Sequence, residues 1–321
     1  MSYLKILLAV LSLSISTSLI SQTRTNPQDQ DKELGKVAWL RDYDAALALA
    51  KKESKPVLIL FQEVPGCATC RNYGHNVLSH PLMTEAIQNE FIPLAIFNNK
   101  RGKDKEILKK YNEPSWNNPV VRIVNADGKD LVTRIARDYS ARGLLNGMLR
   151  ALEVCGIPAP EYMKLLKTEL GATQRKEAYY KMYCFWTGEK ELGSQAGVVN
   201  TNAGFMSGHE VVRVEYDPAQ LSEKQLTEFA QRRSMYPIDK DVSYYHSEKD
   251  EDYYLRRSRY KYLPLSKLQR TKINSALGNG QDASVYLSPQ QRRWLTTTSL
   301  KNNKVLFDKD LLLAWQGKLG Q

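Results

Sequence analysis

The first half of the chain alternates between helical and strand-like spacing of its hydrophobic residues. Residues 39–52 carry apolar side chains at helical spacing, and residues 56–61 follow as a short continuous apolar run. A second such run covers residues 91–97, directly after a helical stretch that ends near Glu90. Uninterrupted apolar runs of this length are typical of strands that are buried on both faces of a sheet. The pattern therefore predicts buried strands separated by helices.

A hairpin and a last helix complete the pattern of the first half. Residues 119–124 and 131–135 are apolar and flank Asp127 and Gly128, a pair that favours a tight turn between strands. Residues 140–154 then return to helical spacing. Read in order, the elements are strand, helix, strand, helix, strand, strand and helix, which predicts an α/β domain.

The second half is predicted to be an α+β domain. A helix that begins after Ser222 carries Gln225 at the third helical position, the pattern of a capping box. Residues 264–321 are predicted as helices separated by Gly278-Asn279-Gly280. Before all of these helices come strand-like segments at residues 178–183, 197–205 and 208–218.

The N-terminus has the pattern of an export signal. Lys5 precedes a run of apolar and hydroxyl residues at positions 6–20, which is shorter than the roughly 20 apolar residues of a membrane-spanning helix. We expect residues 1–21 to be a signal peptide and residues 22–36 to be a polar leader. No later stretch reaches spanning length, so the sequence predicts a periplasmic or secreted protein without stable membrane insertion.

Length and composition favour two globular domains joined by a linker at residues 157–175. The chain has 321 residues, of which 42% are hydrophobic and 25% are charged. The net charge of +11 could indicate a nucleic-acid partner. The densest basic cluster, Arg256, Arg257 and Arg259, follows an acidic run, however, and the other basic residues are scattered. A solvated face of mixed charge explains this pattern, so no nucleic-acid partner is expected.

The four cysteines do not have the spacing of two structural disulfides. Cys67 and Cys70 form a C-x-x-C motif, whereas Cys155 and Cys184 stand apart. The sequence holds no second C-x-x-C motif or suitably spaced Cys/His pair that would complete a zinc site. The spacing therefore favours redox chemistry without a metal or cofactor, with a structural disulfide or a metal pair as the alternatives.

The order of elements, with the C-x-x-C motif between a buried strand and a helix, resembles the thioredoxin fold over residues 37–156. In that family a cis-proline lies beside the active site, and Pro119 matches its position. Gly66 stands where the family usually has tryptophan, directly before the first cysteine. The free N–H groups and the dipole at a helix N-terminus stabilise a thiolate, so Cys67 is the expected nucleophile. Cys70 is expected to resolve the mixed disulfide.

The motifs of the second half resemble methionine sulfoxide reductase A over about residues 176–235, within a predicted domain at 176–321. The resemblance implies that Cys184 is the nucleophile and that Glu210 is the acid that protonates the departing oxygen. It also implies that Phe185 and Trp186 hold the methyl group of the sulfoxide. The matching segments, in order, are Cys184-Phe185-Trp186, residues 197–205 and residues 208–218.

The second half also departs from the pattern of this family. Tyr183 replaces a glycine, Phe205 replaces a tyrosine, and the loop that carries a substrate-binding tyrosine is missing. A later segment of the family supplies an aspartate and another tyrosine that bind substrate. Asp252, with Tyr253 or Tyr254, is the best match for that pair.

Together these features suggest an exported enzyme that reduces methionine sulfoxide in oxidised exported proteins. Because no cysteine follows Cys184, the sulfenic acid formed on it must be reduced by another thiol. Cys67 and Cys70 are the expected built-in reductant, either directly or through Cys155 as a relay. A buried structural thiol is the alternative for Cys155. An upstream thiol reductant would then restore the dithiol.

Two other readings remain open from the sequence. In one, the chain is a thioredoxin-like disulfide reductase whose second domain binds clients without catalysis, which fits the missing loop. Retention of both Cys184 and Glu210 argues against it. In the other, the chain is a structural exported protein with two disulfides, which requires inert Cys67 and Cys70.

Overall fold

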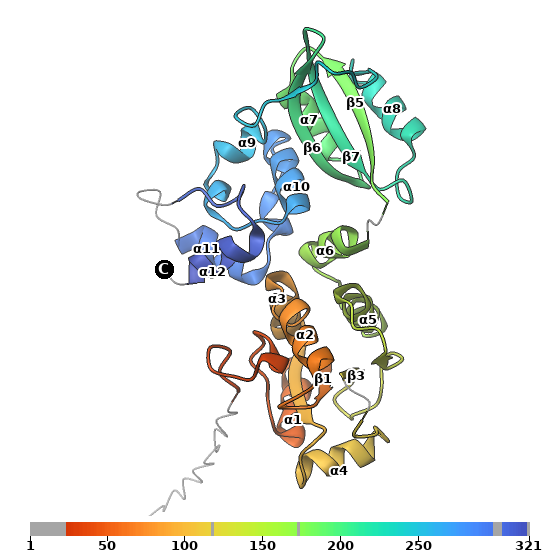
Figure 1. Ribbon diagram of the computed structural model, residues 1–321, viewed down its shortest axis with the longest axis vertical. Coiled ribbons are helices and arrows are strands. Elements are labelled where there is room, and N and C mark those ends of the chain that lie inside the picture. The colour runs from red at the N-terminus through yellow and green to blue at the C-terminus, as the bar shows by residue number, and fades with distance from the viewer. Residues whose placement is uncertain (1–23, 117–118, 172–173, 298–303, 320–321) are drawn as a thin grey trace, which may run out of the picture.

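A computed structural model describes residues 24–116, 119–171, 174–297 and 304–319. The expected signal peptide at residues 1–21 lies outside the described residues. Two sheets occupy opposite ends of the molecule, and a group of helices lies between them (Figure 1). Among the described residues, none of the helices is both long enough and apolar enough to cross a membrane.

The first domain is built on a four-stranded mixed sheet. Its strands are β1 (Val57–Gln62), β2 (Ile92–Phe97), β3 (Val120–Val124) and β4 (Ile135–Ala136). Its helices are α1 (Tyr43–Glu53), α2 (Ala68–Asn76), α3 (Pro81–Glu90), α4 (Lys103–Lys110) and α5 (Ala141–Val154). The strand order is β2-β1-β3-β4, with β1 parallel to β2 and antiparallel to β3. The predicted order of elements is therefore confirmed, except that two helices, α2 and α3, stand between β1 and β2 where one was expected.

Strand β1 is buried on both faces, as its continuous apolar run predicted. Leu58 and Leu60 belong to the hydrophobic cluster that contains α3 and α5. Val57, Ile59 and Phe61 belong to the cluster on the opposite face, which contains α1 and α4. Helices on both faces of a sheet require this pattern, because every side chain of a central strand then meets a helix.

The predicted hairpin forms, but its second strand is shorter than expected. Only Ile135 and Ala136 pair with β3, and Asp130 adds a single bridge. Leu131 and Val132 both pack against the same hydrophobic cluster. Consecutive residues of a strand point to opposite faces, so two neighbours that turn to one core cannot both keep strand geometry.

Residues 24–36, expected as a polar leader ahead of the fold, are instead part of the first domain. They include a 3-10 helix, η1 (Lys32–Leu34), and Leu34 is buried. The Trp39 amide donates to the Thr25 hydroxyl at 2.9 Å, and its indole N–H donates to the Leu34 carbonyl at 2.9 Å. The polar composition of this segment concealed it, because polar side chains such as Thr25, Gln30 and Glu33 make their hydrogen bonds within the domain.

The second domain contains a five-stranded antiparallel sheet. Its strands are β5 (Lys176–Met182), β6 (Val198–Met206), β7 (His209–Tyr216), β8 (Tyr236–Pro237) and β9 (Tyr245–His246), in the order β8-β5-β7-β6-β9. Helices α7 (Phe185–Gly193) and α8 (Glu223–Gln231) pack through one hydrophobic cluster of the sheet. The Ser222–Gln225 capping box that begins α8 is present, as predicted.

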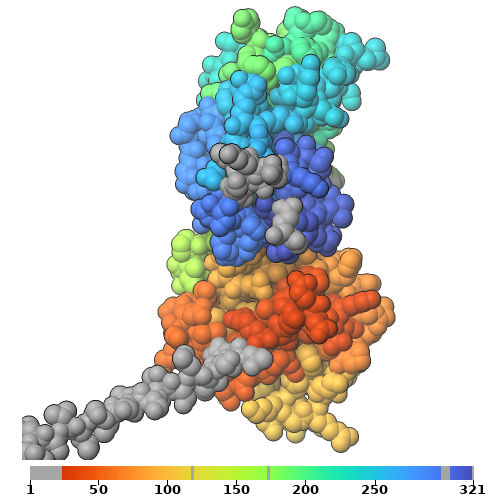
Figure 2. Space-filling view, turned by 90° about the vertical axis from the view of Figure 1, so that its left-hand side faces the viewer, coloured from red at the N-terminus to blue at the C-terminus, as the bar shows by residue number. Residues whose placement is uncertain are grey.

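The helices that follow the second sheet lie between the two sheets (Figures 1 and 2). They are α9 (Tyr253–Arg256), η2 (Arg259–Tyr262), α10 (Lys267–Gly278), η3 (Ala283–Tyr286), α11 (Pro289–Thr297) and α12 (Leu311–Leu319). Buried residues of α10 and α11 share one hydrophobic cluster with the first domain. The Gln290 amide also donates to the Glu85 carboxylate of α3 at 2.6 Å. These helices therefore join the two domains.

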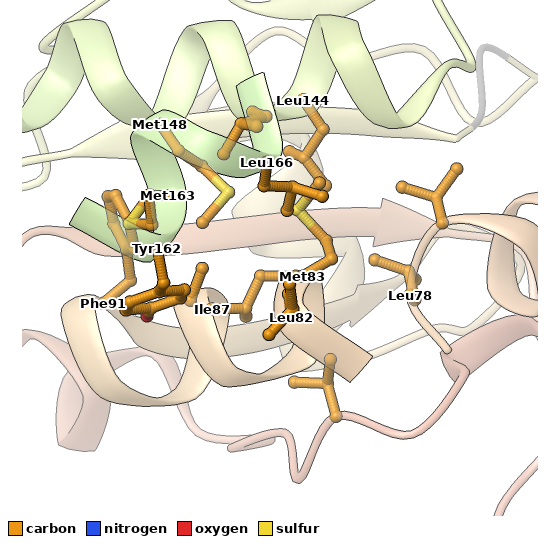
Figure 3. Close-up of a cluster of buried hydrophobic side chains, with 14 of the residues drawn as sticks. Leu78, Leu82, Met83, Ile87, Phe91, Leu144, Met148, Tyr162, Met163 and Leu166 are labelled. Atoms are coloured by element: carbon orange, nitrogen blue, oxygen red, sulfur yellow. The ribbon is translucent and has the colours of Figure 1, made fainter. Parts of the chain in front are cut away.

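The segment between the domains is a packed helix, α6 (Glu161–Gly171). Its amphipathic pattern buries one side against α3 and α5. Figure 3 shows this contact, which involves Tyr162, Met163 and Leu166 of α6, Leu82, Met83 and Ile87 of α3, and Leu144 and Met148 of α5. The linker expected at residues 157–175 therefore contains a helix that is part of the core.

Candidate active sites

The C-x-x-C motif lies at the N-terminus of α2, as predicted. Cys67 is the N-cap residue and is exposed, whereas Cys70 is buried. Their sulfur atoms are 3.4 Å apart, and no disulfide joins them. An exposed sulfur ahead of a buried one is the arrangement that an attacking and a resolving cysteine require.

The surroundings of the two thiols move their pKa values in opposite directions. The backbone hydrogen bond from Cys70, with a smaller contribution from Thr69, lowers the pKa of the Cys67 thiol below its usual value. Burial, followed by the hydrogen bond with Cys67, raises the pKa of Cys70 to about 12. Since the thiolate is the reactive form, Cys67 is the stronger nucleophile at neutral pH.

A carboxylate from the N-terminal segment holds the loop before Cys67. The Gly66 amide donates to Oε1 of Glu33, a buried residue of η1, at 2.8 Å. A Cβ atom on Gly66 would lie 2.3 Å from the Glu63 carbonyl and 2.7 Å from the Cys70 Cβ. The glycine that replaces the usual tryptophan is therefore required by this backbone path. Sequence reasoning missed Glu33, because nothing in the polar segment marked it as buried.

Glu63 is a second carboxylate at this site that the sequence did not single out. It lies between β1 and α2, and one of its carboxylate oxygens and the sulfur atoms of Cys67 and Cys70 all lie within 4.8 Å of one another. In the sequence, the only indication of its role is its position four residues before Cys67. A carboxylate at this distance can accept a proton from the buried thiol.

Pro119 directly precedes β3, which pairs with β1 so that Val120 lies opposite Phe61. The loop at the end of β1 leads to the C-x-x-C motif. Pro119 therefore lies at the same end of the sheet as the two thiols. The bond before it involves Asn118, outside the described residues, so its expected cis geometry stays a prediction.

Cys184 and Glu210 lie together in the second domain. Cys184 is the half-buried N-cap residue of α7, and Met182 pairs with Glu210 across β5 and β7. Oε2 of Glu210 accepts a hydrogen bond from the Phe185 amide at 2.7 Å. The carboxylate is thus fixed at the first turn of the helix that begins after the sulfur. Cys184 and Glu210, which are 26 residues apart in the chain, are therefore close together in the fold, as the sequence predicted.

Aromatic side chains gather around Phe185 and Trp186, the two residues that follow Cys184. Phe185 packs edge-on against Trp186 and Phe205, with ring centroids 5.8 and 5.4 Å away. Trp186 stacks on Tyr253 at 4.0 Å, and the Arg257 guanidinium lies 3.5 Å from the centre of the Tyr253 ring. The two predicted aromatic residues therefore belong to a larger apolar group, to which α9 contributes Tyr253.

Asp252, expected to bind substrate, has other partners. Its carboxylate accepts a hydrogen bond from Arg270 at 2.6 Å, and its amide donates to Glu189 at 3.0 Å. Asp252 is almost fully buried, and none of its hydrogen bonds reaches Cys184 or Glu210. The aspartate therefore anchors the start of α9, while the residues that follow it approach the site.

Tyr254 of α9 lies close enough to Cys184 for the charge of this cysteine to affect the pKa of its phenol. Burial, followed by the nearby charge of Cys184, raises the pKa of its phenol. A tyrosine that keeps its proton can donate a hydrogen bond to a bound oxygen. The sequence named Tyr253 or Tyr254 together as candidates, and the structure gives them different roles.

Cys155, the candidate relay, is the C-cap residue of α5 and is exposed. Burial of its sulfur nevertheless raises the pKa of the thiol. It contacts neither of the other thiol sites through a hydrogen bond among the described residues. The thiols therefore lie at three separate positions. A carboxylate lies near two of them, Glu63 near the C-x-x-C motif and Glu210 near Cys184.

Comparison with known proteins agrees with both resemblances. A family model described as thioredoxin-like matches residues 38–126. The peptide methionine sulfoxide reductase MsrA of Yersinia pestis (strain Pestoides F) and that of Yersinia pseudotuberculosis serotype O:1b (strain IP 31758) are each 38% identical over 66 residues, which cover 15% of this chain and 31% of the relative. This chain thus spans about a third of the length of these relatives.

A solved structure described as DsbH Oxidoreductase is also similar, with 17% identity and a TM-score of 0.32 over 39% of this chain and 91% of that chain. The family model confirms the α/β fold expected for the first half. The chain therefore joins a thioredoxin-like domain to a segment that is similar to part of methionine sulfoxide reductase A.

Proposed function

We propose that this protein reduces methionine sulfoxide in oxidised proteins at Cys184, and that Cys67 and Cys70 supply the electrons. The observation that carries the proposal is the contact of Glu210 with the first turn of α7, directly after Cys184. This contact supports the proposal, because sulfoxide reduction requires an acid close to the attacking thiol.

The proposed first step is attack of the Cys184 thiolate on the sulfur of the sulfoxide. Glu210 donates a proton to the sulfoxide oxygen, which leaves the methionine sulfur and remains on Cys184 as a sulfenic acid. The products are methionine and oxidised Cys184. Phe185 and Trp186 offer the apolar surface for the methyl group, and Tyr254 offers a hydroxyl near the departing oxygen.

The proposed second stage returns Cys184 to the thiol. The Cys67 thiolate attacks the sulfenic sulfur, water leaves, and a disulfide forms between the two residues. Cys70 then attacks Cys67 and releases Cys184, while Glu63 accepts the Cys70 proton. The resulting Cys67–Cys70 disulfide needs two electrons from an upstream thiol reductant.

The test of the first step is turnover of methionine sulfoxide with dithiothreitol as reductant. Cys184→Ser is expected to abolish turnover, and Glu210→Gln to slow it by roughly 10²–10⁴-fold, the usual cost of losing a general acid. The matched control is Glu177→Gln, which alters a carboxylate on the same sheet away from the aromatic group. Full activity of Cys184→Ser would refute the assignment.

The transfer of electrons is tested with Cys70→Ser, in which Cys67 can attack but cannot be released. After treatment with methionine sulfoxide this variant is expected to accumulate a disulfide from Cys67 to Cys184, or to Cys155 if that residue relays. Because helices lie between the two sheets, direct contact needs either their separation or a second copy of the chain. Peptide mapping on a non-reducing gel separates an internal bond from a covalent dimer, and only free Cys67 would exclude the transfer.

A second candidate function is a disulfide reductase whose second domain only binds clients. It is favoured by the missing loop tyrosine and by the engagement of Asp252 with Arg270. In that case Cys184→Ser would retain both disulfide reduction and binding of sulfoxide-containing peptides, and the wild type would show no sulfoxide turnover.

Export to the periplasm or outside the cell is a further part of the proposal, based on the pattern of residues 1–21. The mature protein is expected to lack about 21 residues, which mass measurement would show. An intact Met1 in the extracytoplasmic fraction would exclude removal of a signal peptide.

A further inference from the structure

The C-x-x-C site has a third potential ligand beside its two thiols. Glu63, Cys67 and Cys70 each offer one ligand atom, and these three atoms lie within 4.8 Å of one another. Among the described residues they are the one group of three such side chains close enough to share an ion. Glu63 is half-buried, and its carboxylate makes no hydrogen bond or ion pair with another described side chain.

These distances are close to those of a bound zinc ion. Zinc bonds of about 2.3 Å to sulfur and about 2.0–2.2 Å to carboxylate oxygen place tetrahedral ligands roughly 3.5–3.8 Å apart. The two sulfur atoms are already 3.4 Å apart. The carboxylate needs to move by about 1 Å, which a rotation of the unconstrained Glu63 side chain can provide.

Accessibility also fits a metal ion. Cys67 is exposed, so an ion can enter from solvent and keep water or an external ligand at its fourth position. Cys70 closes the inner side of the site, with Gly66 held in place by Glu33. The set of two sulfur ligands and one carboxylate suits a soft or borderline divalent cation better than magnesium or calcium.

We propose that the reduced C-x-x-C site binds Zn²⁺ through Cys67, Cys70 and Glu63. Binding replaces the protons of the two thiols, so two protons leave as the ion enters. The bound ion occupies the Cys67 sulfur and prevents it from attacking a disulfide or a sulfenic acid. In the metal-free domain, Cys67 and Cys70 reduce a protein disulfide and become a disulfide themselves, which leaves no thiolate to bind an ion. Metal occupancy is therefore linked to the redox state of the domain.

The experiment uses the full chain with Cys155→Ser and Cys184→Ser, so that the remaining thiols belong to the motif. Zn²⁺ is titrated in competition with a chromophoric chelator, and Co²⁺ is titrated while sulfur-to-metal charge-transfer absorption is recorded. We expect one ion per reduced chain and none on the disulfide form. Zn²⁺ is also expected to protect Cys67 from alkylation until a strong chelator is added.

Glu63→Gln tests the third ligand, with Glu106→Gln of α4 as the matched control. Loss of even an indirect partner of a metal ligand costs about 10–100-fold in affinity, so Glu63→Gln should weaken Zn²⁺ binding by at least tenfold. The control variant should bind as the wild type does. Equal affinity of Glu63→Gln and wild type would exclude the carboxylate as a ligand, and equal binding by the reduced and disulfide forms would overturn the proposal. Neither outcome depends on sulfoxide turnover.

Discussion

A buried carboxyl group in the second domain should make its stability depend on pH. Glu189 on α7 has no exposed surface, and its Oε2 accepts a hydrogen bond from the Asp252 amide at 3.0 Å. Burial, followed by the charges of Asp252 and Glu251, raises the pKa of Glu189 well above its usual value. Arg270 balances the charge of Asp252 through their ion pair. Glu189 is therefore protonated in the folded protein at pH values where it is ionised in the unfolded chain.

The sign of the effect follows from this difference. The folded pKa is raised, so the stabilising contribution is complete below the unfolded pKa of about 4.3 and is lost as the pH rises toward the folded pKa. Within that window each pH unit lowers the free energy of unfolding by about 1.4 kcal/mol for one proton. Glu189→Gln keeps the acceptor for the Asp252 amide but has no proton to lose. The stability of this variant relative to wild type should therefore rise as the pH is raised from 5 to 7, with an upper limit of about 3 kcal/mol for one proton over two pH units.

Urea unfolding at pH 5, 6 and 7, followed by circular dichroism, measures this difference. Glu191→Gln is the matched control, because Glu191 lies on the same helix and pairs with Arg233 near the surface. The control variant should show the pH dependence of the wild type. Parallel pH profiles for Glu189→Gln and wild type would refute the assignment of a raised pKa to this buried group.

Three further predictions concern the thioredoxin-like domain. At pH 7, iodoacetamide should modify Cys67 well before Cys70, because the pKa of the first thiol is lowered and that of the second is raised; peptide mass spectrometry reads the order, and simultaneous modification would contradict it. Glu33→Ala should lower the free energy of unfolding by about 1–3 kcal/mol, because it leaves the Gly66 amide without an acceptor. Glu33→Gln keeps an acceptor, so its free energy of unfolding, measured in urea, should be close to that of the wild type. Gly74→Ala should cost about 1–3 kcal/mol in the same assay, since its Cβ would lie 2.0 Å from the Lys32 carbonyl and displace η1; unchanged stability would mean that η1 is not needed.

Local patterns in the sequence determined much of the fold and of both sites. The continuous apolar runs identified β1 and β2, because a strand covered by helices on both faces has no polar side. The Ser222–Gln225 pair fixed the start of α8 through hydrogen bonds within four residues. The positions of Cys67 and Cys184 at helix N-termini followed from motifs that are contiguous in the chain.

Tertiary structure decided the features that depend on contacts between distant segments. Glu33 reaches Gly66 only because η1 packs against α2, and the polar character of residues 24–36 gave no sign of this contact. Asp252 was the best match in the sequence for a substrate-binding aspartate, but the charge of Arg270 from α10 attracts it into a buried ion pair.

The arrangement of the domains likewise could not be read from the chain. An amphipathic pattern predicts that α6 buries one side, but it does not say which surface covers that side. In the folded protein α3 and α5 cover it, and α10 and α11 extend the same core toward the second sheet. The sequence therefore determined which thiols and carboxylates are present and which elements carry them. Packing alone determined how far apart the two thiol sites are held, because that separation depends on side chains from both ends of the chain meeting in one core.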